Sequence, residues 1–202
     1  MIPRKPQNAF SLIFALFLLL GQVIHGHAQS QSNRLPSSVT QQIPKGYEVL
    51  ESRKGDLNHD AYPDLMLVLH KPDEKETSDV IEHPTKRPLL LFKGTKDKNF
   101  QFIARNDNAV YCIDCGGQMG DPFTGITIKK GFFSVEHYGG SGWRWTRIIT
   151  FKYSPNDQKW YLYKDGGESY HASDPEKVSE KVKTSRDFGK VAFSSFDIYK
   201  ED

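Results

Sequence analysis

Oxygen-bearing side chains stand close together in one polar stretch of the sequence, residues 55–65. Side-chain oxygens come at relative positions 1, 3, 5 and 9, with a backbone carbonyl between the last two. These residues are Asp56, Asn58, Asp60, Tyr62 and Asp64. Calcium takes about six to eight oxygen ligands in flexible geometry, and oxygens at alternate positions of a curled loop converge on one point. The spacing therefore predicts a calcium site with these five residues as ligands.

Other interpretations of this stretch differ in what surrounds the oxygens. An EF-hand is excluded because position 12 is Leu67 rather than Glu and because a strand-like apolar run, residues 65–70, follows at once. The oxygen ligands without cysteine disfavour zinc, and magnesium requires stricter octahedral geometry. An Asx-rich turn, whose carboxylates accept hydrogen bonds from backbone N–H groups without a metal, stays open.

Strands are the elements that must position this loop. Short runs of apolar, β-branched and aromatic residues alternate with turn-forming residues, which is typical of antiparallel sheets. The predicted strands cover residues 47–51, 65–70, 88–93, 100–105, 109–113, 125–129, 132–138, 143–153 and 159–164. Residues 191–199 are predicted to form a last strand or an extended segment docked on the sheet. The polar stretch 71–87 is predicted to be a long exposed loop.

One helix is predicted near the C-terminus. Asp174 is followed by a proline and an acid, as at a helix start, and Val178 and Val182 form an i, i+4 pair. These signals predict a helix from about Pro175 to Lys183. The expected fold class is mainly β, with antiparallel β-meander or propeller-blade-like sheets and one short C-terminal helix.

The polar stretch and the runs beside it resemble the calcium loop of FG-GAP repeats, the integrin-type β-propeller blades. In that family Asp-x-Asn-x-Asp-Gly-x-x-Asp-Leu lies between two strands, which matches residues 55–68 and, more weakly, the chain up to Phe102. The resemblance implies metal ligation by the five residues named above. Ala61 replaces the family's glycine, which implies a backbone angle that alanine adopts at a cost. The Phe-Gly and Gly-Ala-Pro half of the repeat is absent.

A complete propeller is excluded because its blades do not fit into the 174 residues that remain of the 202 once a leader of 28 residues is removed. The chain as a whole is similar to uncharacterised exported bacterial proteins that carry one such loop. That similarity implies no particular activity.

The N-terminus has the pattern of a secretory signal. Arg4 and Lys5 precede an apolar run, residues 10–20, and the small residues before and at Ala28 suit cleavage there. The run is shorter than the roughly 18 residues of a membrane span. The predicted organisation is a signal peptide at 1–28, a flexible linker at 29–44 and a single β-rich domain at 45–202. We expect a periplasmic or secreted protein without a membrane span after signal removal.

The charge balance argues against nucleic acid as a partner. The chain has 27 Lys and Arg against 25 Asp and Glu, and two of the basic residues fall in the leader. A near-neutral chain without a Lys/Arg cluster lacks the surface that binds phosphate backbones or anionic membranes.

Cys112 and Cys115, the two cysteines, have Cys-x-x-Cys spacing. In an exported protein such a pair predicts a disulfide. A thioredoxin-like site would need a helix after the pair, and here Gly116 and Gly117 follow. We therefore predict a local structural disulfide, since two cysteines are too few for a zinc site of their own.

A glycine-rich tip flanked by aromatic and basic residues is the second binding candidate. Its flanking residues are His137, Tyr138, Trp143, Arg144 and Trp145. Such a surface suits a sugar ring or a peptide. The alternative is a hairpin whose aromatics only fill the sheet, in which Trp143 and Trp145 share one face and Arg144 takes the other.

An unrecognised hydrolase is the third alternative. Ser141 and His137, together with an aspartate, are residue types that such an enzyme uses, but the Gly-x-Ser-x-Gly motif and its strand-to-helix elbow are absent. Acids for a glycosidase pair are scattered among loops, namely Asp114, Asp121, Glu136 and Glu168. The sequence therefore favours a non-enzymatic binding or structural protein, with a glycan or peptide among its candidate partners.

Overall fold

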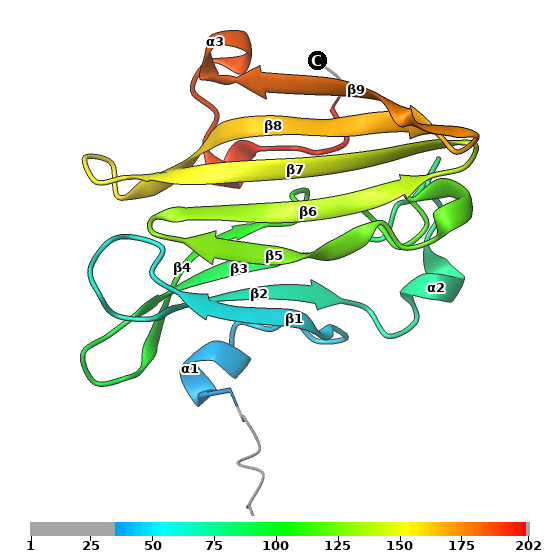
Figure 1. Ribbon diagram of the computed structural model, residues 1–202. Coiled ribbons are helices and arrows are strands. Elements are labelled where there is room, and N and C mark those ends of the chain that lie inside the picture. Colours follow the sequence, from blue (N-terminus) through cyan, green and yellow to red (C-terminus); the bar gives the residue numbers. More distant parts are fainter. Residues whose placement is uncertain (1–34, 201–202) are drawn as a thin grey trace, which may run out of the picture. The chain divides into compact units, whose positions relative to one another are not determined.

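The computed structural model describes residues 35–200, which form two antiparallel sheets (Figure 1). The first consists of β1 (Glu48–Gly55), β2 (Asp64–His70), β3 (Leu89–Gly94) and β4 (Phe100–Asn106), paired in that order. The second consists of β5 (Phe123–Lys129), β6 (Phe132–Gly140), β7 (Trp143–Ser154), β8 (Lys159–His171) and β9 (Asp174–Thr184). The predicted mainly β, antiparallel fold class is confirmed.

Helical structure is limited to single turns. These are α1 (Ser37–Thr40), α2 (Glu74–Thr77), α3 (Ser185–Phe188) and the 3-10 turns η1 (Gly117–Met119) and η2 (Phe193–Ser195). Between residues 35 and 200, no helix has the length and apolar character that crossing a membrane requires. The predicted signal peptide and residues 29–34 of the predicted linker lie outside the described residues.

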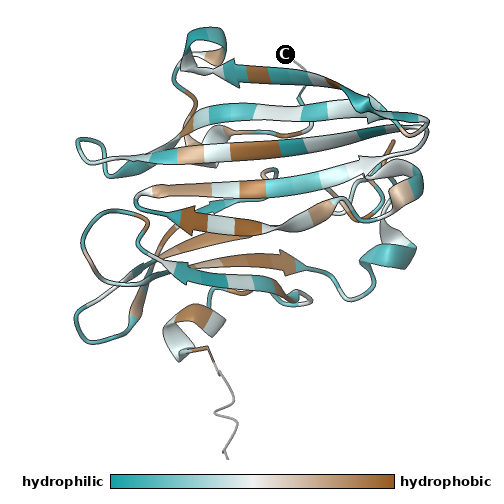
Figure 2. Ribbon diagram, in the orientation of Figure 1, coloured by the Kyte–Doolittle hydropathy of each residue, from teal (hydrophilic) through white to brown (hydrophobic). Residues whose placement is uncertain are grey.

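Strand β2 is buried on both faces. Met66 and Val68 face the main core, which both sheets line, whereas Leu65, Leu67 and Leu69 face a smaller cluster beside α1. In Figure 2 the β2 arrow is mostly brown, in contrast to the teal α2. The polar stretch 56–63 thus leads directly into the most deeply buried strand of the first sheet.

Part of the predicted linker is packed against the first sheet. Residues 37–40 form α1, and Val39 is buried. Leu35, Val39 and Ile43 recur every four residues and all contact the smaller cluster. The spacing is that of one face of a helix, and these three side chains attach an otherwise polar segment to the first sheet.

The helix predicted at residues 175–183 is wrong, because this segment is β9. Val178 and Val182 are four residues apart, which puts them on one side of a strand as well as of a helix. Pairing with β8, which extends to His171, decides between the two. Pro175 is tolerated because β9 is an edge strand. The C-terminal helix is α3, a single turn after β9 with a capping box formed by Thr184 and Asp187.

Two further segments pack on the sheets without being strands. Residues 109–113, predicted to be a strand, form irregular chain whose Val110 and Cys112 are buried. The segment 191–199 is docked as predicted, with Phe193, Phe196 and Ile198 in the main core.

Candidate functional site: the β1–β2 turn

The turn between β1 and β2 is held by its own side chains. The Asp56 carboxylate accepts hydrogen bonds from the N–H groups of Asn58 (3.2 Å) and His59 (2.7 Å). Asn58 Oδ1 accepts from the Asp60 N–H, and Asp60 Oδ1 accepts from the Tyr62 N–H, both at 3.0 Å. All the hydrogen bonds of an Asx-rich turn are therefore present.

Asp64 ties this turn to the neighbouring strand pair. Its side chain is fully buried, and its two oxygens accept hydrogen bonds from the N–H groups of Leu57 and Gly94, each at 2.7 Å. Burial raises the pKa of Asp64, and the nearby charges of Asp60 and Asp56 raise it further. The two hydrogen bonds thus do not fully compensate the ionised carboxylate for the hydration that it loses on burial.

The turn also contacts the second sheet. The Asp56 carbonyl accepts a hydrogen bond from the Gly131 N–H at 3.0 Å. The Leu57 carbonyl accepts one from the indole Nε1–H of Trp160 at 3.0 Å, and the Leu57 side chain lies in the main core. The β1–β2 turn therefore links both sheets, so changes in it affect how the sheets pack.

Ala61 has a φ of 66°, as its place in the family pattern implies. Left-handed backbone costs an L-residue about 1–2 kcal/mol, whereas glycine adopts it freely. We expect Ala61→Gly to raise the free energy of unfolding by about 0.5–1 kcal/mol, after allowing for the greater chain entropy of glycine. Urea denaturation measures this change. An equal gain in the free energy of unfolding from Ala172→Gly, outside the turn, would contradict the inference that the backbone of Ala61 is strained.

Few positive charges lie near the three acids of the turn, Asp56, Asp60 and Asp64. Lys93 Nζ lies 3.1 Å from Asp60 Oδ2 and is the one basic group between residues 35 and 200 that forms an ion pair with them. Burial opposes ionisation of Asp60, but the Tyr62 N–H and Lys93 outweigh it, so its pKa is lowered. In the described chain these three carboxylates do not all lie within 4.8 Å of one another. A calcium ion would therefore have to draw them closer together.

The predicted 137–145 surface is divided between two faces of the second sheet. His137 is buried and lies edge-on to Tyr111, with ring centroids 5.0 Å apart, and Trp145 contacts the same ring at 5.9 Å. Tyr138 and Arg144 alternate with these residues and face the other way. Trp143, at the start of β7, is 62% exposed. The five residues do not form one patch.

His137 has its imidazole in the interior. Its Nε2 accepts a hydrogen bond from the Tyr111 N–H (3.3 Å). Burial, with the nearby charge of Arg147, lowers the pKa of His137 to about 3. The imidazole is therefore neutral at physiological pH and is part of the packing.

This buried imidazole predicts acid sensitivity. Between pH 6.5, the ordinary pKa, and about 3, the unfolded chain binds one more proton at His137 than the folded chain. The free energy of unfolding should therefore fall as the pH falls through this range, by up to about 1.4 kcal/mol per pH unit. His137→Gln should flatten the pH dependence of the urea midpoint, whereas His83→Gln, at an exposed position, should not. An unchanged slope in His137→Gln would contradict this assignment.

Three of the four acids considered for hydrolysis have separate partners. Glu136 accepts a hydrogen bond from Thr127, Asp114 accepts one from Ser78, and Asp121 binds Arg87. Glu136 and His137 point to opposite faces of β6 because they are adjacent in a strand. Glu136 and His137 therefore do not act together as an acid–base pair.

Two open surface hollows lie away from the predicted sites. One, of about 410 Å³, includes Arg105, Ser195 and Lys200 in its lining, and the other, of about 550 Å³, includes Tyr47 and Lys71. None of the site residues predicted from sequence lines either hollow.

Comparison with known proteins supplies no relative. No family model, curated protein or solved structure matches this chain. The resemblance of the β1–β2 turn to FG-GAP loops therefore depends on the residues of the turn itself.

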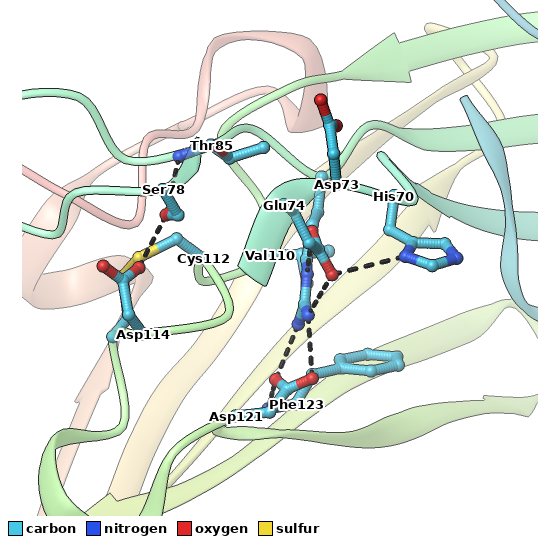
Figure 3. A network of polar contacts seen from close by, with 12 residues as sticks. His70, Asp73, Glu74, Ser78, Thr85, Val110, Cys112, Asp114, Asp121 and Phe123 are labelled. Carbon is cyan, nitrogen blue, oxygen red and sulfur yellow. Dashed lines mark hydrogen bonds and ion pairs between the residues drawn. A yellow bond between two sulfur atoms is a disulfide. The ribbon is translucent and has the colours of Figure 1, made fainter. Parts of the chain in front are cut away.

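A buried ion network is the feature that the sequence did not indicate (Figure 3). Arg87 is fully buried and binds both carboxylate oxygens of Glu74 (3.0 and 2.6 Å) and of Asp121 (2.6 and 2.7 Å). His70 Nδ1 lies 3.3 Å from Glu74. The sequence predicts a long exposed loop at 71–87, and this is wrong at Glu74 and Arg87, which the network holds in the interior. Arg87 and the adjacent Lys86 have similar sequence surroundings, so composition alone does not reveal which one is buried.

Proposed function

We propose that the protein is an exported, non-enzymatic β domain whose β1–β2 turn binds calcium as a structural ion. The observation that carries this proposal is the charge of the turn. Three carboxylates lie on one short connection, one of them is fully buried with a raised pKa, and a single lysine pairs with them in the described part of the chain. A hard divalent cation would relieve the repulsion among these carboxylates.

The position of the turn supports a structural role for this ion. The turn is hydrogen-bonded to Gly94 in the first sheet, to Trp160 in the second and to Gly131 in the turn between β5 and β6. An ion that draws Asp56 and Asp60 toward Asp64 would fix these contacts. Because the ion would prefer the folded state, it would stabilise the domain by about 2.7 kcal/mol at a calcium concentration 100 times its dissociation constant.

Calcium titration of the purified protein tests this proposal. We expect heat of binding and a rise in melting temperature for the wild type, and loss of both in Asp60→Asn. Asp79→Asn is the matched control, because Asp79 also accepts two backbone N–H bonds in a polar loop away from the turn. No heat and no thermal shift up to millimolar calcium would reject the proposal.

A second candidate function is ligand binding at the β6–β7 tip. Trp143 is exposed beside His171, with ring centroids 5.3 Å apart. On the opposite face Arg144 forms no ion pair within residues 35–200, and its Nη1 has no hydrogen-bond partner. Tyr138 and Tyr170 lie beside it, and a hydrogen bond with Tyr138 raises the pKa of Tyr170. These groups suit a glycan or a peptide.

Glycan and peptide arrays separate the two candidates. Binding that is lost in Trp143→Ala or Arg144→Ala but kept in Asp60→Asn would support the tip as a ligand site. Absence of binding by the wild type to either array would remove this candidate.

A further inference from the structure

The turn that contains the two cysteines brings three metal-ligand groups together. The ligand atoms of Cys112, Asp114 and Cys115 all lie within 4.8 Å of one another. No other set of three His, Cys, Asp or Glu residues does so between residues 35 and 200. The cysteine Cα atoms are 5.1 Å apart and the sulfurs are at disulfide-bonding distance. In this oxidised state the sulfurs bind each other and are not available to a metal.

Contacts other than the disulfide hold this arrangement. Ser78 Oγ donates a hydrogen bond to Asp114 Oδ1 at 2.6 Å, and accepts one from the Thr85 N–H at 3.1 Å (Figure 3). The Cys115 N–H donates to the Cys112 carbonyl at 3.2 Å. These bonds do not depend on the sulfurs, so the three ligands stay near one another when the disulfide is reduced.

We propose that the reduced turn binds a thiophilic divalent cation of the Zn²⁺ type through both thiolates and the Asp114 carboxylate. Tetrahedral zinc with Zn–S of about 2.3 Å and Zn–O of about 2.0 Å places its ligand atoms roughly 3.5–3.8 Å apart. Side-chain rotation brings the three groups to this spacing. Water takes the fourth position. The all-oxygen β1–β2 turn suits hard cations instead, so the two sites are chemically distinct.

The metal-bound and disulfide forms exclude each other and interconvert by thiol–disulfide exchange. A thiolate of a dithiol reductant attacks Cys115, whose side chain is less buried than that of Cys112. The second thiol of the reductant then resolves the mixed disulfide, so two electrons and two protons pass to the pair and the reductant becomes a disulfide. The metal ion replaces the two thiol protons. A disulfide oxidant takes both electrons back, restores the bond and releases the ion.

Cobalt and zinc titrations of the full protein test this site. The reduced, metal-free wild type should bind one equivalent of Co²⁺ with a thiolate-to-cobalt absorption band, which Zn²⁺ then displaces. The protein with its disulfide intact should show no band. Asp114→Asn keeps an oxygen that accepts the Ser78 hydrogen bond. It should weaken cobalt binding by at least about tenfold, because even the loss of a group that only orients a metal ligand has an effect of this size.

Two control variants distinguish ligation from folding. Asp97→Asn removes an exposed carboxylate from another turn and should bind cobalt like the wild type. Cys115→Ser should lose the band while its near-UV circular dichroism matches that of the reduced wild type. The proposal is overturned if the reduced wild type shows no band, or if Asp114→Asn or Cys115→Ser binds as tightly as the wild type.

Discussion

Replacing Arg87 with methionine is expected to lower the free energy of unfolding by about 3–5 kcal/mol. The substitution leaves the Glu74 carboxylate, with a side chain only 4% exposed, and the Asp121 carboxylate without their shared cation. Burial disfavours the charge of Arg87, but the bonds to Asp121 and Glu74 outweigh it and hold the pKa of Arg87 above its ordinary value. The loss therefore comes mainly from the buried Glu74 carboxylate left without compensation, because the Asp121 side chain is 38% exposed and water can solvate it.

Urea denaturation with a matched variant separates this effect from a general loss of charge. Arg105→Met breaks an ion pair of the same type, but Arg105 and Asp107 have side chains 37% and 45% exposed, so the expected loss is below about 1 kcal/mol. Adding Glu74→Gln and Asp121→Asn to Arg87→Met should recover part of the stability, because neutral side chains tolerate burial better. Equal losses from Arg87→Met and Arg105→Met would show that the buried network is not a stability determinant.

The strands were predictable because the evidence for them is local. Alternation and turn residues located eight of the nine strands of the sheets, and Asx chemistry indicated the hydrogen bonds of the β1–β2 turn. The error at β9 arose because a four-residue spacing fits both a helix and a strand. Only pairing with β8, which a single segment does not reveal, distinguishes them.

The sequence analysis misplaced His137 and missed Arg87 for different reasons. Phe133, Val135 and His137 share one face of β6, so counting alternate positions from the two apolar residues would have placed His137 in the core. For Arg87 no such local signal exists. Its partner Asp121 lies 34 residues further along the chain, and only the packing of the 71–87 segment against the loop before β5 brings them together.

Replacing Asp64 with alanine is expected to lower the free energy of unfolding by about 2–5 kcal/mol. The change leaves the buried N–H groups of Leu57 and Gly94 without an acceptor, at about 1–3 kcal/mol each. Asp64→Asn keeps one acceptor oxygen but turns an NH₂ group toward the other donor, so roughly half of this loss is expected. Asp79→Ala is the control, because it removes the acceptor of two exposed N–H groups and should lose about 1 kcal/mol or less.

Urea denaturation in the presence of a chelator isolates this role of Asp64 from metal binding. Without calcium, Asp60→Asn should stay within about 1 kcal/mol of the wild type, because Asp60 contacts only a partly exposed lysine and the turn itself. With calcium, the wild type should gain stability that both Asp60→Asn and Asp64→Ala lack. A loss in Asp64→Ala that is seen only with calcium would mean that Asp64 acts as a ligand and not as the acceptor that joins the turn to β3. If Asp64→Ala loses stability in chelator and calcium then stabilises it as much as it stabilises the wild type, Asp64 acts as this acceptor and not as a ligand.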